Sequence, residues 1–433
     1  MSKLFVFMID ALCSCDIEYM KTLPNFNRVI SAGSYVKNLL PVHPALTYCC
    51  HTSIVTGCYC DRHGIHNNEK YDRGCKTGDV WFGMKDEIKV PTILDLAREN
   101  GMSTCSLSWP VSAGADYTYN WPMIVPYHYE GDHPEDYLVN GNATQNLLDS
   151  YFWKYGRFQK GKDASLDLLT MALAPDIIRD YGQPDVMFVK MCDLDSVRHS
   201  YGVYHPYTKD QLKKHDEEFG VLLKSLEMYG DIDDTNFVII GDHGQTDIED
   251  VLNINTLFKE AGFIRTDENG EIIDCDCFGH SGALTCFIEL KNPDDKVMYD
   301  KVYNYLLSLK DDAKISLDYV YDRKQMKEIF HLDGPYDFVI ESNRGISFND
   351  DMTRQTVWQS ACPGDHKIGA ATHGGNPYRK ETTLFIASGP AVKQGVVINE
   401  ASMVDEAVTM AKMIGLDMNN TDGKLMEELL KWK

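Results

Sequence analysis

The chain has 433 residues with a hydrophobic fraction of 43%, which predicts a folded globular protein built as one large α/β unit or two domains. Its formal net charge is −23. A field of this sign repels polyanions, so the composition argues against a nucleic-acid-binding surface. The 13 cysteines lack the regular spacing of a disulfide scaffold, so we expect mostly reduced thiols and a cytoplasmic location. No run approaches about 20 apolar residues, so we expect no membrane span. The apolar run 4–9 lacks a basic n-region, the length of a signal core and a cleavage site, so we expect no secretory leader.

Short apolar runs that end in aspartate recur along the first part of the chain. Residues 4–9 precede Asp10, residues 185–191 precede Asp193 and Asp195, and residues 236–241 precede Asp242. Runs of this length without polar alternation are typical of strands that are buried on both faces. Three such aspartates therefore predict a common site at the carboxyl edge of one parallel sheet.

Helical periodicity and stop signals fill much of the sequence between these runs. We expect helices at 23–32, 90–100, 165–181, 210–229, 402–414 and 423–432, and further strands at 35–40, 102–107 and 383–387. The aromatic residues of 109–136 predict a long loop over the sheet edge, either a lid or substrate wall or a buried structural loop. Residues 253–361 change to short alternating segments, which predicts a smaller α+β insertion or cap between two parts of the core, 1–252 and 362–433.

Thr47 lies where a loop turns into a helix. Pro41 and Pro44 disfavour helix before it, and Gly57 is a plausible stop after it. By itself Thr47 is most simply interpreted as a helix cap. The unpaired N–H groups at a helix start can also receive an anion, so the same position suits phosphate chemistry.

Metal-ligand residue types gather around the predicted strand ends. They are Asp10, Asp195, His199, Asp242, His243 and His373, with the Thr47 hydroxyl as a seventh oxygen or nitrogen donor. Aspartate and neutral histidine suit zinc, manganese and similar divalent ions. Asp195 and His199 are four residues apart, so on one helical turn both would face the same ion.

The order and spacing of these motifs resemble one family. The motifs are P-A-L-T at 44–47, H-T-S-I-V-T-G-C-Y-C-D-R-H-G-I at 51–65, D-S-V-R-H at 195–199, I-I-G-D-H-G-Q-T at 239–246 and T-H-G-G at 372–375. Together they resemble the alkaline phosphatase superfamily, and within it the nucleotide pyrophosphatase/phosphodiesterases and related phosphonate hydrolases. The resemblance implies an α/β fold with a mostly parallel central sheet and helices on both faces.

The resemblance also implies two divalent metal ions, most often zinc, with manganese or another divalent ion as alternatives. Asp10, Asp242, His243 and the Thr47 oxygen would hold one ion, and Asp195, His199 and His373 the other. Asp193 is the alternative to Asp195, which we prefer for its four-residue distance from His199.

The implied activity is hydrolysis of a small phosphate ester by a phosphodiesterase or pyrophosphatase that forms a phosphothreonine at Thr47. The Tyr48 N–H and Asn68 are candidate substrate contacts. Cys50, a further candidate, stands where the phosphodiesterase branch usually has asparagine. Phosphonate C–P hydrolysis, phosphomonoester hydrolysis and a metal-binding protein without turnover stay open as alternatives. Arg198 is expected either on the surface or at a substrate anion.

Overall fold

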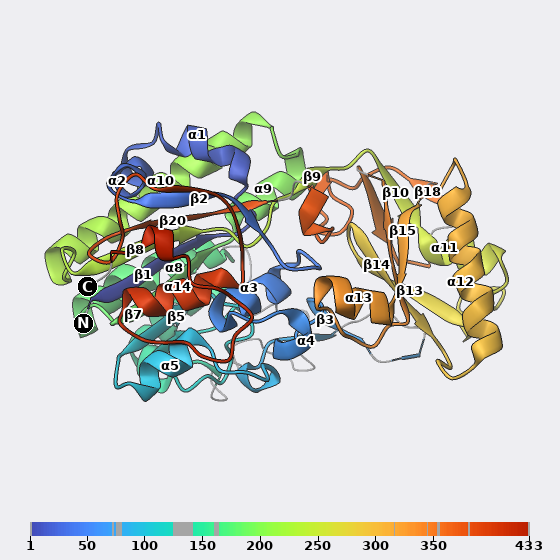
Figure 1. Ribbon diagram of the computed structural model, residues 1–433, viewed down its shortest axis with the longest axis horizontal. Coiled ribbons are helices and arrows are strands. Elements are labelled where there is room, and N and C mark those ends of the chain that lie inside the picture. The colour runs from blue at the N-terminus through green and yellow to red at the C-terminus, as the bar shows by residue number, and fades with distance from the viewer. Residues whose placement is uncertain are drawn as a thin grey trace.

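The computed structural model describes residues 2–71, 73–74, 80–123, 142–159, 164–315, 317–343, 345–352, 356–379 and 382–431. Two lobes lie side by side (Figure 1). The larger lobe is built on a long central sheet, and the smaller lobe on a separate four-stranded sheet. No helix in the described ranges is both long enough and apolar enough to cross a membrane.

The central sheet has eight strands within the described residues, in the order β21-β2-β20-β8-β1-β7-β5-β6. Their bounds are β1 (Lys3–Ile9), β2 (Ser34–Leu40), β5 (Thr104–Leu107), β6 (Tyr119–Trp121), β7 (Val186–Met191), β8 (Thr235–Ile240), β20 (Thr383–Ser388) and β21 (Val397–Ser402). All neighbouring pairs are parallel except those that β20 makes with β2 and β8. This confirms the expected mostly parallel sheet.

Helices cover both faces of this sheet because its central strands are apolar on both sides. In β1, Leu4, Val6 and Met8 belong to one hydrophobic cluster, and the alternate residues Phe5 and Phe7 belong to another. The first cluster is covered by α3 (Thr47–Thr56), α5 (Ile93–Glu99) and α14 (Asp405–Met413), and the second by α2 (Pro24–Ala32), α7 (Gln145–Tyr155), α8 (Leu166–Tyr181) and α10 (Pro206–Tyr229). Shorter helices are α1 (Ile17–Met20), α4 (Cys60–His63) and α9 (Asp193–Tyr201).

The smaller lobe has its own hydrophobic core, to which Ile288, Leu306 and Ile340 contribute. Its sheet has the order β13 (Cys277–Gly282), β14 (Thr285–Leu290), β16 (Phe338–Ser342) and β15 (Leu317–Asp322). Its helices are α11 (Ile254–Glu260), α12 (Lys296–Asp311) and α13 (Arg323–Phe330). A three-stranded sheet adds β10 (Asp250–Asn253), β17 (Ile346–Asn349) and β18 (Trp358–Gln359), and β11 (Ile264–Thr266) pairs with β12 (Ile272–Cys275). Outside residues 253–361, two short pairs are β3 (Glu69–Lys70) with β4 (Val80–Trp81) and β9 (Thr246–Asp247) with β19 (Ala371–Thr372). Residues 253–361 thus combine strands and helices with the α+β character that the sequence predicts.

Two predictions of local structure are wrong. The terminal helix predicted at 423–432 is absent from the described residues 423–431, where only Glu427–Leu429 makes one 3₁₀ turn. The buried Leu430 instead bridges to Val392, and backbone bonds to residues 391–393 replace those of a helix. Residues 109–136 are not all loop, because β6 adds an edge strand to the sheet; residues 124–136 of this stretch lie outside the described ranges.

The cysteines are mostly free thiols. Eleven described cysteines make no disulfide, and Cys275 is disulfide-bonded. The expectation of mostly reduced cysteines therefore holds for the described residues.

Candidate metal centre and nucleophile

The three predicted aspartate-ended strands are neighbours in the sheet. β8, β1 and β7 lie side by side and run parallel, so their carboxyl ends meet at one edge. Asp10 follows β1, Asp242 follows β8, and α9, which carries Asp195 and His199, follows β7. Gly241, just before Asp242, lets the end of β8 lie against the loop after β1, because a Cβ at this position would lie 2.6 Å from the Leu12 carbonyl oxygen.

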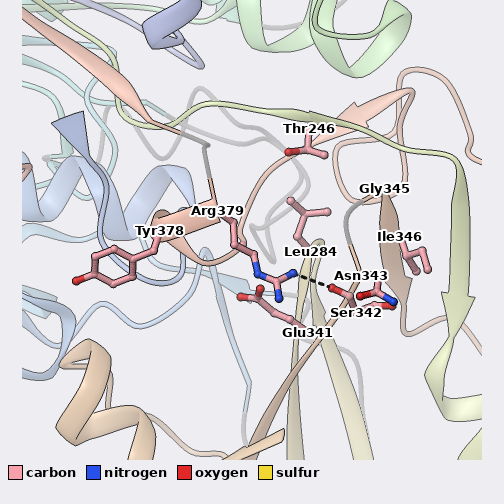
Figure 2. A pocket seen from close by; sticks show the side chains of 10 residues that line it. Thr246, Leu284, Glu341, Ser342, Asn343, Gly345, Ile346, Tyr378 and Arg379 are labelled. Carbon is pink, nitrogen blue, oxygen red and sulfur yellow. Dashed lines mark hydrogen bonds between the residues drawn. The ribbon is translucent and has the colours of Figure 1, made fainter. Parts of the chain in front are cut away.

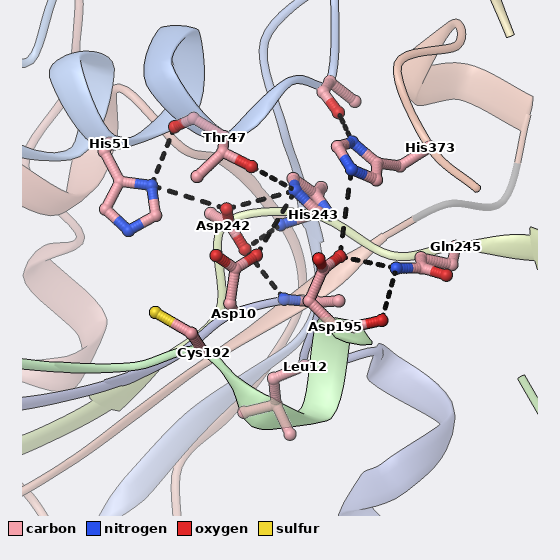
Figure 3. Close-up of polar contacts among 12 residues, drawn as sticks. Asp10, Leu12, Thr47, His51, Cys192, Asp195, Asp242, His243, Gln245 and His373 are labelled. Carbon is pink, nitrogen blue, oxygen red and sulfur yellow. Dashed lines mark hydrogen bonds and ion pairs between the residues drawn. The ribbon is translucent and has the colours of Figure 1, made fainter. Parts of the chain in front are cut away.

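Thr47 is the first residue of α3, and Leu46 occupies the cap position. The prediction that Thr47 itself caps the helix is therefore one residue off. Gly57 ends the helix in the left-handed conformation, with φ of 64°, as expected. The Thr47 Oγ1 lies 3.3 Å from His243 Nε2, and His51, one turn further along, donates from Nδ1 to the Thr47 carbonyl at 2.7 Å. The hydroxyl thus points from a fixed helix start into the aspartate and histidine cluster (Figure 3).

Asp10, Asp242 and His243 form the first group of candidate ligands. One oxygen or nitrogen atom from each lies within 4.8 Å of the others. His243 Nε2 is 3.1 Å from Asp242 Oδ2 and 3.5 Å from Asp10 Oδ1. The other Asp242 oxygen accepts from the backbone N–H of Ala11 at 3.0 Å, which fixes the carboxylate plane.

Asp195, His199 and His373 form the second group, again within 4.8 Å of one another. Asp195 Oδ1 lies 3.2 Å from His199 Nε2 and 3.8 Å from His373 Nε2. Asp193, the sequence alternative, instead pairs with Lys214 at 2.8 Å. The His243 and His373 rings stack at 3.6 Å between centroids, so the two groups adjoin.

The three histidines are oriented alike by the backbone. His199 Nδ1 lies 2.8 Å from the Ala371 carbonyl, His373 Nδ1 2.9 Å from the Ala45 carbonyl, and His243 Nδ1 3.2 Å from the Gly244 carbonyl. A histidine that donates from Nδ1 keeps a lone pair at Nε2. In all three, the nitrogen that faces the carboxylates is therefore the one able to bind a cation.

Burial sets the protonation of the cluster. It lowers the pKa of His243 and of His373 to about 3 each, which keeps both imidazoles neutral at physiological pH. Burial likewise raises the pKa of Asp10 and of Asp242, and Lys190 only partly offsets this effect. For Asp195 burial is again the largest influence, but His199 and His373 outweigh it and hold the pKa well below its usual range.

The cluster has the properties of a cation site. Asp10 Oδ1, Asp242 Oδ2 and His199 Nε2 are buried, and no hydrogen-bond partner for them lies within the described residues. Buried carboxylates are costly unless they are paired or bind a metal. Two sets of Asp and His donors fit divalent ions of the zinc and manganese type. The residues present therefore fit the two-ion arrangement that the sequence predicts.

The candidate substrate contacts differ from the prediction in two respects. The Tyr48 N–H donates to Asn68 Oδ1 at 2.9 Å, so this N–H is engaged by Asn68 and not open to a phosphate oxygen. Asn68 is thereby fixed next to Thr47. Cys50 is fully buried within the hydrophobic cluster on its side of the sheet, so it packs in the core and the prediction of a substrate contact gains no support. The Tyr48 ring meets Trp81 edge to face at 5.1 Å.

Several residues at the site were not predicted from the sequence. Lys190 Nζ lies 2.7 Å from Asp10 Oδ2, and Gln245 Nε2 donates to Asp195 Oδ1 at 2.6 Å. Arg198 is fully buried and pairs with Asp16, so both roles expected for it, surface residue and substrate contact, are wrong. Among these neighbours of the site, His51 is the one whose position the sequence could have indicated, because it lies four residues after Thr47 on the same helix face.

A separate pocket of about 250 Å³ lies between the lobes, beside the loops that follow His243 and His373 (Figure 2). Among the described residues its lining includes Thr246, Leu284, Glu341 and Arg379, but none of the seven predicted ligands. Arg379 donates to the Ser342 carbonyl at 3.3 Å and pairs with Asp318. The pocket is therefore distinct from the cluster around Thr47, which stays the candidate site.

Comparisons with known proteins agree with this geometry. A family model described as type I phosphodiesterase / nucleotide pyrophosphatase matches residues 4–375. Ectonucleotide pyrophosphatase/phosphodiesterase family member 7 of Rattus norvegicus is 23% identical over 420 residues, which cover 92% of this chain and 80% of the relative. The venom phosphodiesterase of Naja atra is 23% identical and matches 99% of this chain but 46% of its own length.

Solved structures show the same fold. Murine ectonucleotide pyrophosphatase/phosphodiesterase 5 aligns with a TM-score of 0.68 at 17% identity, over 99% of this chain and 100% of that chain. An inactive variant of the murine protein, in complex with AMP, aligns with a TM-score of 0.67 at 17% identity over 100% of both chains. The chain belongs to the type I phosphodiesterase/nucleotide pyrophosphatase family, whose members are metal-dependent hydrolases of phosphate esters.

Proposed function

We propose that this chain hydrolyses a phosphodiester or pyrophosphate bond of a small nucleotide-like substrate, with Thr47 as the nucleophile and two divalent ions held by Asp10, Asp242 and His243 and by Asp195, His199 and His373. The observation that carries the proposal is the position of Thr47 Oγ1, 3.3 Å from His243 Nε2, next to two adjoining ligand groups. Zinc is the proposed ion, with manganese as the alternative.

In this mechanism the ligand groups, Thr47, His51 and Asn68 have different roles. Bound divalent ions would favour the Thr47 alkoxide and offset the charge of the phosphoryl oxygens. The Thr47 oxygen bonds to phosphorus, the ester oxygen leaves, and water then hydrolyses the phosphothreonine. His51 holds the Thr47 carbonyl, and Asn68 holds the Tyr48 N–H and keeps amide N–H donors for a phosphoryl oxygen.

A small nucleotide-like substrate is supported by two observations of different kinds. A structural neighbour of the same fold is known in complex with AMP. In this chain, Tyr48, the residue after the nucleophile, forms an aromatic pair with Trp81 of β4, and aromatic side chains of this kind suit a planar group. A cytoplasmic location and the lack of binding to nucleic-acid polymers stay predictions.

Replacement of the nucleophile tests the proposal. Thr47→Ala should lower the rate with bis(4-nitrophenyl) phosphate by roughly a thousandfold or more, since no other hydroxyl replaces it. Metal content by mass spectrometry should be retained, because six side-chain ligands remain. Thr56→Ala removes a threonine hydroxyl at the far end of the same helix and should keep the rate. Equal rates for wild type and Thr47→Ala would refute the nucleophile assignment.

A substrate panel separates the alternatives. We expect diesters and dinucleotides to be hydrolysed faster than 4-nitrophenyl phosphate, and phosphonoacetate not to be hydrolysed. Turnover of phosphonoacetate alone would favour C–P hydrolysis. Metal binding without turnover of any of these substrates would favour a non-catalytic metal-binding protein.

A further inference from the structure

A short junction joins the two ligand groups. Ala11 directly follows Asp10 and adopts the left-handed conformation, with φ of 59°. Its N–H donates to Asp242 Oδ1 at 3.0 Å, and its carbonyl accepts from Arg198 Nη1. Arg198 itself lies on α9 between Asp195 and His199. The guanidinium therefore holds the Asp10 loop against the helix that carries the second group.

Two further contacts fix this guanidinium. Nη2 of Arg198 lies 2.8 Å from each oxygen of Asp16, and Nη1 lies 2.8 Å from Cys13 Sγ. Cys13 also packs with Val203 and Ala371, and the Ala371 carbonyl accepts from the ligand His199. A change at the Cys13 sulfur therefore reaches both the Arg198 contact and the support of His199.

Cys13 has a second thiol beside it. The Sγ atoms of Cys13 and Cys15 and a carboxylate oxygen of Asp16 lie within 4.8 Å of one another. Cys13 is 5% exposed, whereas Cys15 is exposed to solvent. One accessible thiol thus stands next to one buried thiol, three residues after the ligand Asp10.

A metal ion is a poor occupant for this cluster. Both oxygens of Asp16 are bound by Arg198, and one of them also accepts from the Cys13 N–H at 2.8 Å. The buried guanidinium would in addition repel a second cation at this distance. With metal binding disfavoured, the reactive groups of this cluster are the two thiols of Cys13 and Cys15.

We propose that Cys13 and Cys15 form a site of reversible thiol oxidation, at which a hydroperoxide converts the pair to a disulfide and thereby loosens the Arg198 junction. The Cys15 thiolate attacks one peroxide oxygen, the O–O bond breaks, and Cys15 becomes a sulfenic acid while the other oxygen leaves with a proton as an alcohol, or as water when the oxidant is hydrogen peroxide. The Cys13 sulfur then attacks the Cys15 sulfur, the S–S bond forms as the S–O bond breaks, and the hydroxyl leaves with the Cys13 proton as water. Two thiols lose two electrons and two protons, and the peroxide takes up both.

The thiol chemistry supports the order of these steps. A hydrogen bond from the Cys13 thiol lowers the pKa of Cys15, while the same bond and, next to it, burial raise the pKa of Cys13. The thiolate is the reactive form of cysteine, so the exposed Cys15 reacts first and the buried Cys13 resolves it. A disulfide between residues so near in sequence closes a strained ring, and strained disulfides are the easily reduced ones.

The effect on activity rests on the proposed function. When Cys13 turns toward Cys15, Arg198 Nη1 loses one of its contacts, and the Ala11 carbonyl and Asp242 lose part of their support. Groups that orient metal ligands change affinity or activity by about 10-fold to 100-fold when removed. We therefore expect oxidation to lower diesterase activity by about tenfold or more.

Oxidation of the full chain with hydrogen peroxide tests the site. Peptide mass spectrometry should map a Cys13–Cys15 link that dithiothreitol reverses, together with the loss and recovery of activity. Cys15→Ser should form no such link and keep its activity under the same oxidant. Cys362→Ser, which removes another exposed cysteine, should behave like wild type.

Other outcomes would overturn the proposal. These are Cys15 oxidised without a link to Cys13, a link that leaves activity unchanged, or Cys15→Ser inactivated as fast as wild type. A lower metal content in Cys15→Ser would instead identify a metal site at the thiols. The mass map does not depend on turnover, so failure of the proposed diesterase activity in the reduced protein is seen separately.

Discussion

The buried ion pair between Lys190 and Asp10 allows a quantitative prediction. Nζ of Lys190 lies 2.7 Å from Asp10 Oδ2, and the two side chains are 0% and 5% exposed. Unit charges at this distance interact by roughly 6 kcal/mol at an effective dielectric constant of 20. Desolvation offsets part of this, and the removal of one partner of a buried pair costs about 3–5 kcal/mol.

Lys190→Met keeps an unbranched side chain that is one atom shorter and removes its charge. In EDTA, urea unfolding should show a free energy of unfolding lower by about 3–5 kcal/mol. With divalent metal the loss should be smaller, because bound cations would compensate the charge of Asp10. Lys3→Met is the matched control, since Lys3 pairs with Asp185 at the same 2.7 Å but with side chains 22% and 35% exposed. Its cost should be about 1 kcal/mol or less.

A double-mutant cycle isolates the pair. Asp10→Asn combined with Lys190→Met should recover much of the loss, with a coupling of at least about 2 kcal/mol. Equal losses for Lys190→Met and Lys3→Met, or a coupling below about 0.5 kcal/mol, would refute the reasoning that burial decides the strength of this interaction.

Three further predictions concern metal, pH and the core. EDTA dialysis should abolish diesterase activity and lower the thermal midpoint, and zinc or manganese should restore both; full activity after dialysis would contradict the two-ion site. Glu406 is fully buried, and burial with Asp405 raises its pKa well above 4.5. Above the ordinary pKa of about 4.5 the unfolded chain ionises at Glu406 while the folded protein keeps the proton, so the free energy of unfolding should fall by up to about 1.4 kcal/mol per pH unit until the raised pKa is reached. Urea unfolding of Glu406→Gln should show no such fall. Phe219→Ala, between Phe7 and Phe26 at 5.0 and 5.8 Å, should cost about 3–5 kcal/mol, whereas Met228→Ala on the exposed face of α10 should stay within about 0.5 kcal/mol in the same assay.

The central strands were predictable because their signal is local. β1, β7 and β8 are short apolar runs that end near an acid, and this pattern follows from burial on both faces of a parallel sheet. The start of α3, within one residue, and its stop at Gly57 were predictable for the same reason. The prediction of a terminal helix at 423–432 was wrong because backbone groups of residues 429–431 bond to residues 391–393 in an extended conformation instead of to one another.

The sequence by itself determined which residue types meet at the sheet edge and in what chain order. Only the tertiary structure decided their partners. Lys190 and Asp10 are 180 positions apart and meet because β1 and β7 pair in parallel, with Met8 opposite Lys190. Arg198 is enclosed because α9 packs over the loop that follows β1, which no spacing within D-S-V-R-H reveals. Spacing along the chain sets which side chains share a helix face or strand end, whereas the order and register of the strands set which distant charges become neighbours.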